Sequence, residues 1–93
     1  MNIERETIYQ EEIAVLEEST DLRNLVVYND DVNTFDHVID TLIKVCGHSV
    51  EQAEQCTWLI HYKGKCTVKV GSYEELEGMC TSLHLKELSA DIQ

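Results

Sequence analysis

The chain has 93 residues, 43% of them hydrophobic, and 7 basic residues stand against 18 acidic ones for a formal charge of −11. This length fits a single domain with a modest core. The strong negative charge argues against nucleic acid and anionic membranes as partners, because both attract basic surfaces. We therefore expect a cationic or neutral partner.

The first 21 residues differ in composition from the rest. Residues 1–21 hold seven acidic residues against Arg5 alone, a net charge of −6, and their apolar residues follow no regular period. This pattern predicts an acidic flexible tail at 1–21 ahead of a folded core at 22–93. The acidic start is unlike a signal peptide, and no apolar run has the length of a membrane-spanning helix. We expect a cytoplasmic protein.

The four cysteines form no C-x-x-C pair. Without an export signal they are expected to be reduced thiols, most of them small apolar core residues. A zinc site built from Cys46 and His48 would need two further ligands that the sequence does not offer. The sequence thus predicts no metal and no cofactor.

The first predicted element is a strand at residues 23–29, where β-branched and aromatic residues end in turn formers. A helix follows from Thr34, the expected N-cap, because apolar residues then recur with the helical period as far as Cys46. Gly47 is a natural helix stop.

The second predicted helix lies in residues 48–62, with Ser49 and Gln52 spaced as a capping box. Gly64 ends this helix, and residues 65–71 alternate like a half-buried strand. The expected inward residues are Val50, Ala53, Cys56, Thr57 and Ile60 on the helix and Cys66, Val68 and Val70 on the strand.

A third helix is predicted at residues 72–85, where Ser72 and Glu75 again have the capping-box spacing, and a weak strand at 87–92 completes the pattern. The order β-α-α-β-α-β indicates an α+β fold. We expect a small antiparallel three-stranded sheet with three helices packed on one face.

The sequence Asn29-Asp30-Asp31, between the first strand and the first helix, has two interpretations. Asn and Asp often hydrogen-bond nearby backbone amides, so a turn and a helix entry is the simpler interpretation of these residues alone. The alternative is a site that holds a positively charged group. His61 and the HYKGK sequence at 61–65 are by themselves no more than a helix end.

Catalytic and metal-binding interpretations have weaker support. Cysteine, histidine and aspartate are all present, as in a thiol hydrolase, but no local signature marks a nucleophile. No glycine-rich phosphate loop occurs. Asp30, Asp31, Asp36 and Asp40 are a conceivable metal site, but they lack the spacing and the glycine of a calcium loop.

At VVYNDDVNTFDHVIDTLIKV and AEQCTWLIHYKGKCTV the chain resembles the ClpS family, the adaptors of ClpAP-type ATP-dependent proteases. Several family motifs occur in order and at matching separations, which is more specific than any one motif. The resemblance implies a fold like the C-terminal domain of the ribosomal stalk protein, in agreement with the order above. It also implies a non-enzymatic adaptor that binds proteins with a bulky hydrophobic first residue, called an N-degron, and delivers them to a AAA+ Clp unfoldase.

By motif position, the resemblance assigns the free α-amino group of the bound protein to Asn29, Asp31 and His61. Such a group has a pKa of about 7.7–8.0, so it is largely an ammonium with three N–H donors at neutral pH. The three side chains offer an amide oxygen, a carboxylate and a neutral imidazole nitrogen as acceptors. The resemblance places the pocket for the first side chain at Asn33, Phe35, Val38, Leu42, Thr57, Ile60 and Leu88.

Phe35 departs from the commonest family pattern, which has methionine there. Asn33-Thr34 replaces a frequent Thr-Pro, and Thr57 replaces a frequent methionine. The stiffer, wider Phe35 would shift the preference among bulky first residues, or would close the pocket and leave a protein that only binds and modulates the unfoldase. Alternatively, Phe35 is simply a buried residue at the start of a helical apolar stripe. A small thiol- or metal-dependent enzyme is the remaining alternative.

Glu74 matches an acidic position of the family's unfoldase-binding surface, and Met79 stands where a lysine is frequent. The tail 1–21 resembles the N-terminal extension that the family inserts toward the unfoldase channel. The implied partners are therefore a Clp-type AAA+ unfoldase and N-degron proteins, with neither nucleic acid nor a membrane.

Overall fold

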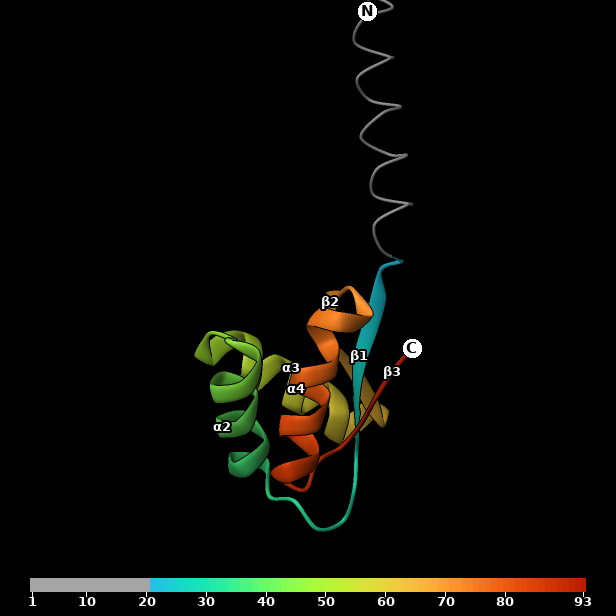
Figure 1. Cartoon of the computed structure of the whole chain (residues 1–93). Coiled ribbons are helices and arrows are strands. Elements are labelled where there is room, and N and C mark those ends of the chain that lie inside the picture. The colour runs from blue at the N-terminus through green and yellow to red at the C-terminus, as the bar shows by residue number, and fades with distance from the viewer. Residues whose placement is uncertain (1–20) are drawn as a thin grey trace, which may run out of the picture.

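The computed structural model describes residues 21–93, in which three helices pack on one face of a three-stranded antiparallel sheet (Figure 1). The strand order is β2-β1-β3, and the predicted α+β fold is confirmed. The predicted tail lies outside the described residues, apart from Asp21. The elements are β1 (Arg23–Tyr28), α2 (Phe35–Cys46), α3 (Val50–Lys63), β2 (Lys65–Gly71), α4 (Tyr73–Leu85) and β3 (Ser89–Ile92).

The three helices begin where the sequence predicts, because each start has its own capping residue. Thr34 Oγ1 accepts a hydrogen bond from the backbone N–H of His37 at 3.1 Å. Ser49 and Ser72 each complete a capping box, in which the side chain three residues later accepts from the N-cap backbone. Gly47 ends α2 in the left-handed region at φ 71°, which a residue with a side chain rarely adopts.

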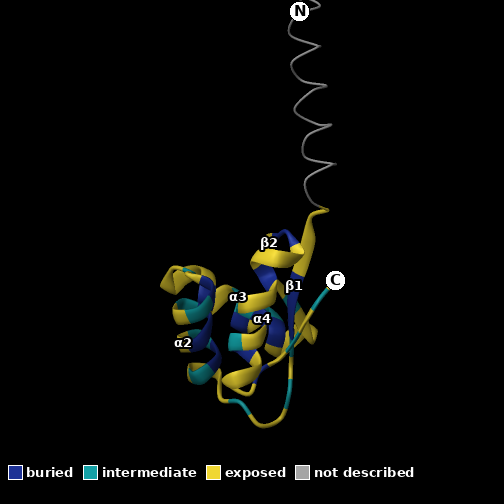
Figure 2. Cartoon of the chain, viewed as in Figure 1, coloured by how far each residue is buried: buried dark blue, intermediate teal, exposed yellow. Residues whose placement is uncertain are grey.

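The core lies between the helices and the central strand β1. Leu25 and Val27 belong to this core and are 0% and 1% exposed, while Val26, 4% exposed, is buried outside the core cluster. Figure 2 shows the buried positions on the sides of the helices that face one another and the sheet. Removing this apolar surface from water is the main force that holds the helices on the sheet. The other buried hydrophobic residues are Val38, Leu42, Cys46, Ala53, Ile60, Val68, Leu76, Cys80, Leu83 and Leu88.

Two residues predicted to face inward are instead on the surface. Val70 is 55% exposed, because the pairing of β1 with β2 jumps from Lys69 to Thr67 and leaves Val68 as the extra residue of a β-bulge. The bulge breaks the alternation that the prediction assumed. Val50 is also 55% exposed, because it is the first residue of α3 and the buried face begins one turn later, at Ala53.

Candidate functional site

The loop between β1 and α2 carries the Asn29-Asp30-Asp31 sequence, and its two acidic residues have different surroundings. Asp30 Oδ1 accepts from the backbone N–H groups of Val32 at 2.9 Å and Asn33 at 2.8 Å, while Oδ2 accepts from Asn33 Nδ2 at 2.7 Å. Partial burial alone would raise the pKa of Asp30, but these hydrogen bonds outweigh it and lower the pKa below its ordinary value. Asp30 therefore shapes the loop.

The neighbouring Asp31 is exposed, and its side chain has no hydrogen-bond partner among residues 21–93. The hydrogen bonds of Asp30, by contrast, confirm the simpler interpretation of this sequence, a turn and a helix entry. The same turn leaves the carboxylate of Asp31 open to solvent. An exposed, unpaired carboxylate beside a rigid turn is suited to binding a cation.

A backbone hydrogen bond ties this loop to the end of α3. The N–H of Asn29 donates to the carbonyl oxygen of Gly64 at 2.9 Å, so the predicted strand residue Asn29 lies just beyond β1. Gly64 caps α3 in the left-handed region at φ 95°, three residues after His61. The ring of Phe35 meets the ring of His61 edge to face, with centroids 5.9 Å apart. Segments distant in the sequence therefore meet at one corner of the molecule. We define this corner by Asn29 and its loop, Phe35 at the start of α2, and His61 and Gly64 at the end of α3.

His61 differs from the other three histidines in its hydrogen bonds. A ring nitrogen of His37 bonds to the Lys86 carbonyl at 2.9 Å, that of His48 to the Val68 carbonyl at 2.7 Å, and that of His84 to the Ala90 carbonyl at 2.6 Å. A carbonyl oxygen only accepts, so each of these rings donates. His61 has neither ring nitrogen bonded within the described part of the chain, which leaves it free to accept from a ligand.

The turn between α4 and β3 braces the start of α2. Asn33 Nδ2 donates to the carbonyl oxygen of Glu87 at 2.8 Å as well as to Asp30. Glu87 adopts φ 68°, a left-handed conformation that is uncommon for a residue with a side chain. Because no glycine stands there, the sequence does not predict it. Together with the bond between His37 and Lys86, this contact brings the predicted pocket residue Leu88 to the same corner. The sequence does not predict that Asn33 and His37 hold this turn against the start of α2, because their partners lie about 50 positions away.

Of the seven predicted pocket residues, five are buried, Asn33 is half-buried and Phe35 is exposed. Phe35 is 38% exposed, so its interpretation as a buried core residue is wrong. It lies over His61 and forms a wall of the corner. The Thr57 hydroxyl donates to the Ala53 carbonyl at 2.7 Å, which satisfies its polar group inside the core. The buried members are Val38, Leu42, Thr57, Ile60 and Leu88.

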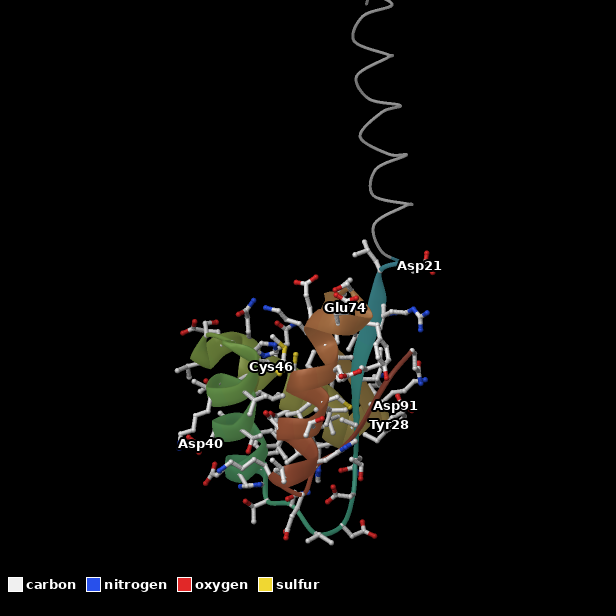
Figure 3. The ribbon with its side chains drawn as sticks, in the orientation of Figure 1. Asp21, Tyr28, Asp40, Cys46, Glu74 and Asp91 are labelled. Carbon is white, nitrogen blue, oxygen red and sulfur yellow. The ribbon has the colours of Figure 1, made fainter. Side chains whose placement is uncertain are left out.

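Glu74 lies far from this corner. It is exposed in the first turn of α4, at the end of the molecule opposite the loop that joins β1 to α2 (Figure 3). Met79, on the same helix, is half-buried and packs against the core. Glu74 can therefore contact a partner without obstructing the corner, whereas Met79 offers only part of its side chain.

The thiols and carboxylates offer little for catalysis or metal binding. All four cysteines are free. Burial raises the pKa of Cys46 to about 11 and that of Cys66 to about 12, so little reactive thiolate forms near neutral pH. Asp40 pairs with Lys44 at 2.9 Å. Residues 21–93 contain no group of three or more His, Cys, Asp or Glu side chains able to hold a metal ion.

No helix within residues 21–93 is long and apolar enough to cross a membrane. The fold and the corner instead define a small α+β domain with open hydrogen-bond acceptors beside an exposed aromatic ring, a type of surface suited to binding a cationic apolar group.

The chain belongs to the ClpS family: the model described as ATP-dependent Clp protease adaptor protein ClpS matches residues 18–91. The ClpS adapter protein of Synechocystis sp. is 41% identical over 54 residues, 57% of this chain and 55% of that protein. That of Streptomyces coelicolor is 32% identical over 68 residues, 73% of this chain and 71% of that protein. The chain spans just over half the length of the cyanobacterial relatives, at 55% and 56%.

A solved structure has the same fold. Agrobacterium tumefaciens ClpS2 bound to L-phenylalaninamide matches with a TM-score of 0.68 at 20% identity, over 77% of this chain and 96% of that one. The family resemblance and the fold expected from it are therefore confirmed. At this identity the likeness concerns the fold alone.

Proposed function

We propose that this protein is an adaptor that binds proteins through a bulky hydrophobic first residue and delivers them to a Clp-type AAA+ unfoldase. It performs no chemistry on them. One observation carries the proposal: the hydrogen bond from Asn29 to Gly64 joins the loop that bears the unpaired Asp31 to the helix end that bears the unpaired His61.

The corner suits a free α-amino group. That group is largely an ammonium at neutral pH and has three N–H donors. Asn29 Oδ1, the Asp31 carboxylate and a neutral nitrogen of His61 are three acceptors for those donors. An internal residue of a protein has one uncharged amide N–H instead, so it satisfies neither the charge nor the acceptors. The net charge of −11 favours the approach of a cation.

Apolar residues beside this corner suit the first side chain. Phe35 is exposed, and the other residues that the resemblance assigns to the pocket, Val38, Leu42, Ile60 and Leu88, are buried members of the core. The ligand of the Agrobacterium protein, L-phenylalaninamide, combines a free α-amino group with an aromatic side chain. This combination supports a preference for Phe, Tyr, Trp or Leu as the first residue of the bound protein.

The test is calorimetry with peptides that differ only in the first residue. Peptides beginning with Phe, Leu, Tyr or Trp are expected to bind at least about tenfold more tightly than a Ser-initiated one, because a buried side chain of this size contributes about 1.5–3 kcal/mol. Equal affinities across the panel would contradict the proposal.

A Clp unfoldase contact at Glu74 is tested separately, by a Glu74→Lys variant that should bind peptide normally but fail in delivery.

Replacing Phe35 by alanine is expected to change selectivity more than affinity. Because Phe35 is an exposed wall, its removal widens the corner and should admit Ile- and Val-initiated peptides, which branch at Cβ and need the width there. A peptide array compares the wild-type, Phe35→Ala and Phe35→Leu proteins. The Leu variant keeps an apolar wall and should retain the exclusion. An unchanged profile in Phe35→Ala would show that Phe35 is no gate.

Affinity is expected to fall as the pH drops from about 7.5 to about 5.5, the range in which histidine side chains titrate. Protonation would turn the His61 acceptor into a second cation facing the ammonium. Carboxyl groups ordinarily titrate near pH ~4 and the α-amino group remains charged, so neither causes the loss.

The matched variant for this effect is His61→Gln, whose amide oxygen accepts but does not titrate. Calorimetry at several pH values should give weaker binding near pH ~7.5 and an almost flat profile. The same pH slope in both proteins would assign the effect to His37, His48 or His84, and His61 would not be an α-amino ligand.

A further inference from the structure

A row of aromatic rings leads from the candidate corner along α3. The ring of His61 contacts that of Tyr62 edge to face, with centroids 5.0 Å apart, and the ring of Tyr62 contacts that of Trp58 at 4.3 Å with a tilt of 38°. Phe35 contacts His61 from α2 at 5.9 Å. The row therefore runs in the order Phe35, His61, Tyr62, Trp58.

The outer two rings are open to solvent. Trp58 is 52% exposed and Tyr62 is 62% exposed, although both are large aromatic residues. They are four residues apart on α3, a spacing that puts two side chains next to each other on the helix surface, so each ring packs against the other. Paired Trp and Tyr rings give a broad, rigid contact surface that loses little conformational entropy on binding.

We propose that Trp58 and Tyr62 bind the side chain of the second residue of the bound protein and favour an aromatic or large aliphatic residue there. This inference rests on the proposed function, because the first residue must be anchored for the second to have a defined position. His61 separates Phe35 from Tyr62 in the row. Side chains of an extended chain alternate in direction, so a first side chain on the Phe35 side puts the second on the Tyr62 side.

The pair is continuous with the corner, which favours this occupant over others. Successive Cα atoms are 3.80 Å apart in any chain, so the second residue cannot lie far from His61 once the α-amino group is held there. Two alternatives compete with this assignment. The second side chain could instead contact Val32, which is 78% exposed on the loop between β1 and α2, or a second copy of this protein could cover the aromatic pair. The experiment separates these cases.

Trp58 is the only tryptophan of the chain, so intrinsic fluorescence reports on it directly. Peptides beginning Phe-Gly, Phe-Leu and Phe-Phe with identical remainders are titrated into the wild-type protein. We expect Phe-Leu and Phe-Phe to bind about 2- to 10-fold more tightly than Phe-Gly, the range for a well-packed aromatic contact. They should also change the Trp58 emission more than Phe-Gly does at saturation.

Three variants then assign the preference, with affinities measured by calorimetry because Trp58→Ala removes the fluorophore. Trp58→Ala and Tyr62→Ala should bring the three peptides to within about twofold of one another, because the second side chain then lacks its aromatic contact. Tyr73→Ala is the matched control, since Tyr73 is an exposed aromatic residue, at 49%, on α4. It should retain the wild-type preference.

Several results would overturn the inference while leaving the proposed function intact. These are equal binding of the three peptides by wild type, an equal loss for all three in Trp58→Ala, or loss of the preference in Val32→Ala instead. A dimer in sedimentation that Trp58→Ala converts to monomer would assign the pair to a second copy. If no Phe-initiated peptide binds at all, the proposed function fails and this inference fails with it.

Discussion

A Phe-initiated peptide is expected to lose about 100-fold or more in affinity when its α-amino group is acetylated. Acetylation replaces an ammonium by an uncharged amide, which removes the positive charge and two of the three N–H donors. Two of the acceptors among Asn29, Asp31 and His61 then lose their partner. Each lost partner costs about 1–3 kcal/mol, and about 1.4 kcal/mol corresponds to a factor of ten.

Calorimetry on the free and acetylated forms of one peptide measures this difference. The control is a Ser-initiated peptide in both forms, which separates the amino group's contribution from that of the side chain. The loss should shrink in His61→Gln and Asp31→Asn, because each variant has already weakened one ammonium contact. Equal affinity of the two Phe-initiated forms would remove the basis of the adaptor proposal.

The adjacent acids Asp31 and Asp30 are expected to give opposite results when each is changed to asparagine. Asp31 is exposed and has no partner within the described residues, so Asp31→Asn should leave the free energy of unfolding unchanged. It removes the negative charge opposite the ammonium, and peptide affinity should fall about tenfold or more, because a hydrogen bond to a charged group contributes about 1.5–3 kcal/mol.

Asp30→Asn should instead destabilise the fold. An asparagine at this position points an NH₂ group, in place of Oδ2, at the Nδ2 donor of Asn33, and the unfolding free energy should fall by about 1 kcal/mol. The folded state lowers the pKa of Asp30, so the ionised carboxylate stabilises the fold above the unfolded pKa and loses this effect as the pH falls through the folded pKa. The difference in unfolding free energy between the wild-type protein and Asp30→Asn should therefore narrow below about pH 4.

Urea unfolding at several pH values measures the stability effect, and calorimetry on the same preparations measures binding. Asp36→Asn is a control for charge alone, since it removes one exposed carboxylate from the first turn of α2. A large stability loss in Asp31→Asn would show that its carboxylate has a structural partner. Stability in Asp30→Asn equal to wild type at neutral pH would show that the three hydrogen bonds do not hold the loop.

The order and the starts of the helices were determined by the sequence itself, because the interactions that set them are local. Ser49 with Gln52, and Ser72 with Glu75, lie within one helical turn, so their capping boxes form in the structure as predicted. Gly47 and Gly64 end their helices because a left-handed residue is required there. The motifs that contain Asn29, Asp31 and His61 likewise indicate the family from the sequence alone.

The tertiary structure decided what depends on distant partners. The β-bulge at Val68 arises from pairing with β1 and moves Val70 to the surface, against the alternation of its own strand. Phe35 has the spacing of a core residue, yet it is 38% exposed, and its ring lies against His61 of α3.

The different roles of Asp30 and Asp31 also follow from the folded loop. The two residues are identical in type and adjacent in sequence, but only Asp30 turns toward the backbone N–H groups of Val32 and Asn33. Asn33 in turn reaches Glu87, 54 positions away, whose left-handed backbone no sequence signal marks. Helical periodicity and capping depend on residues within a turn or two of the chain, so the sequence shows them. Which hydrogen-bond acceptors remain free depends on contacts that exist only after the chain has folded.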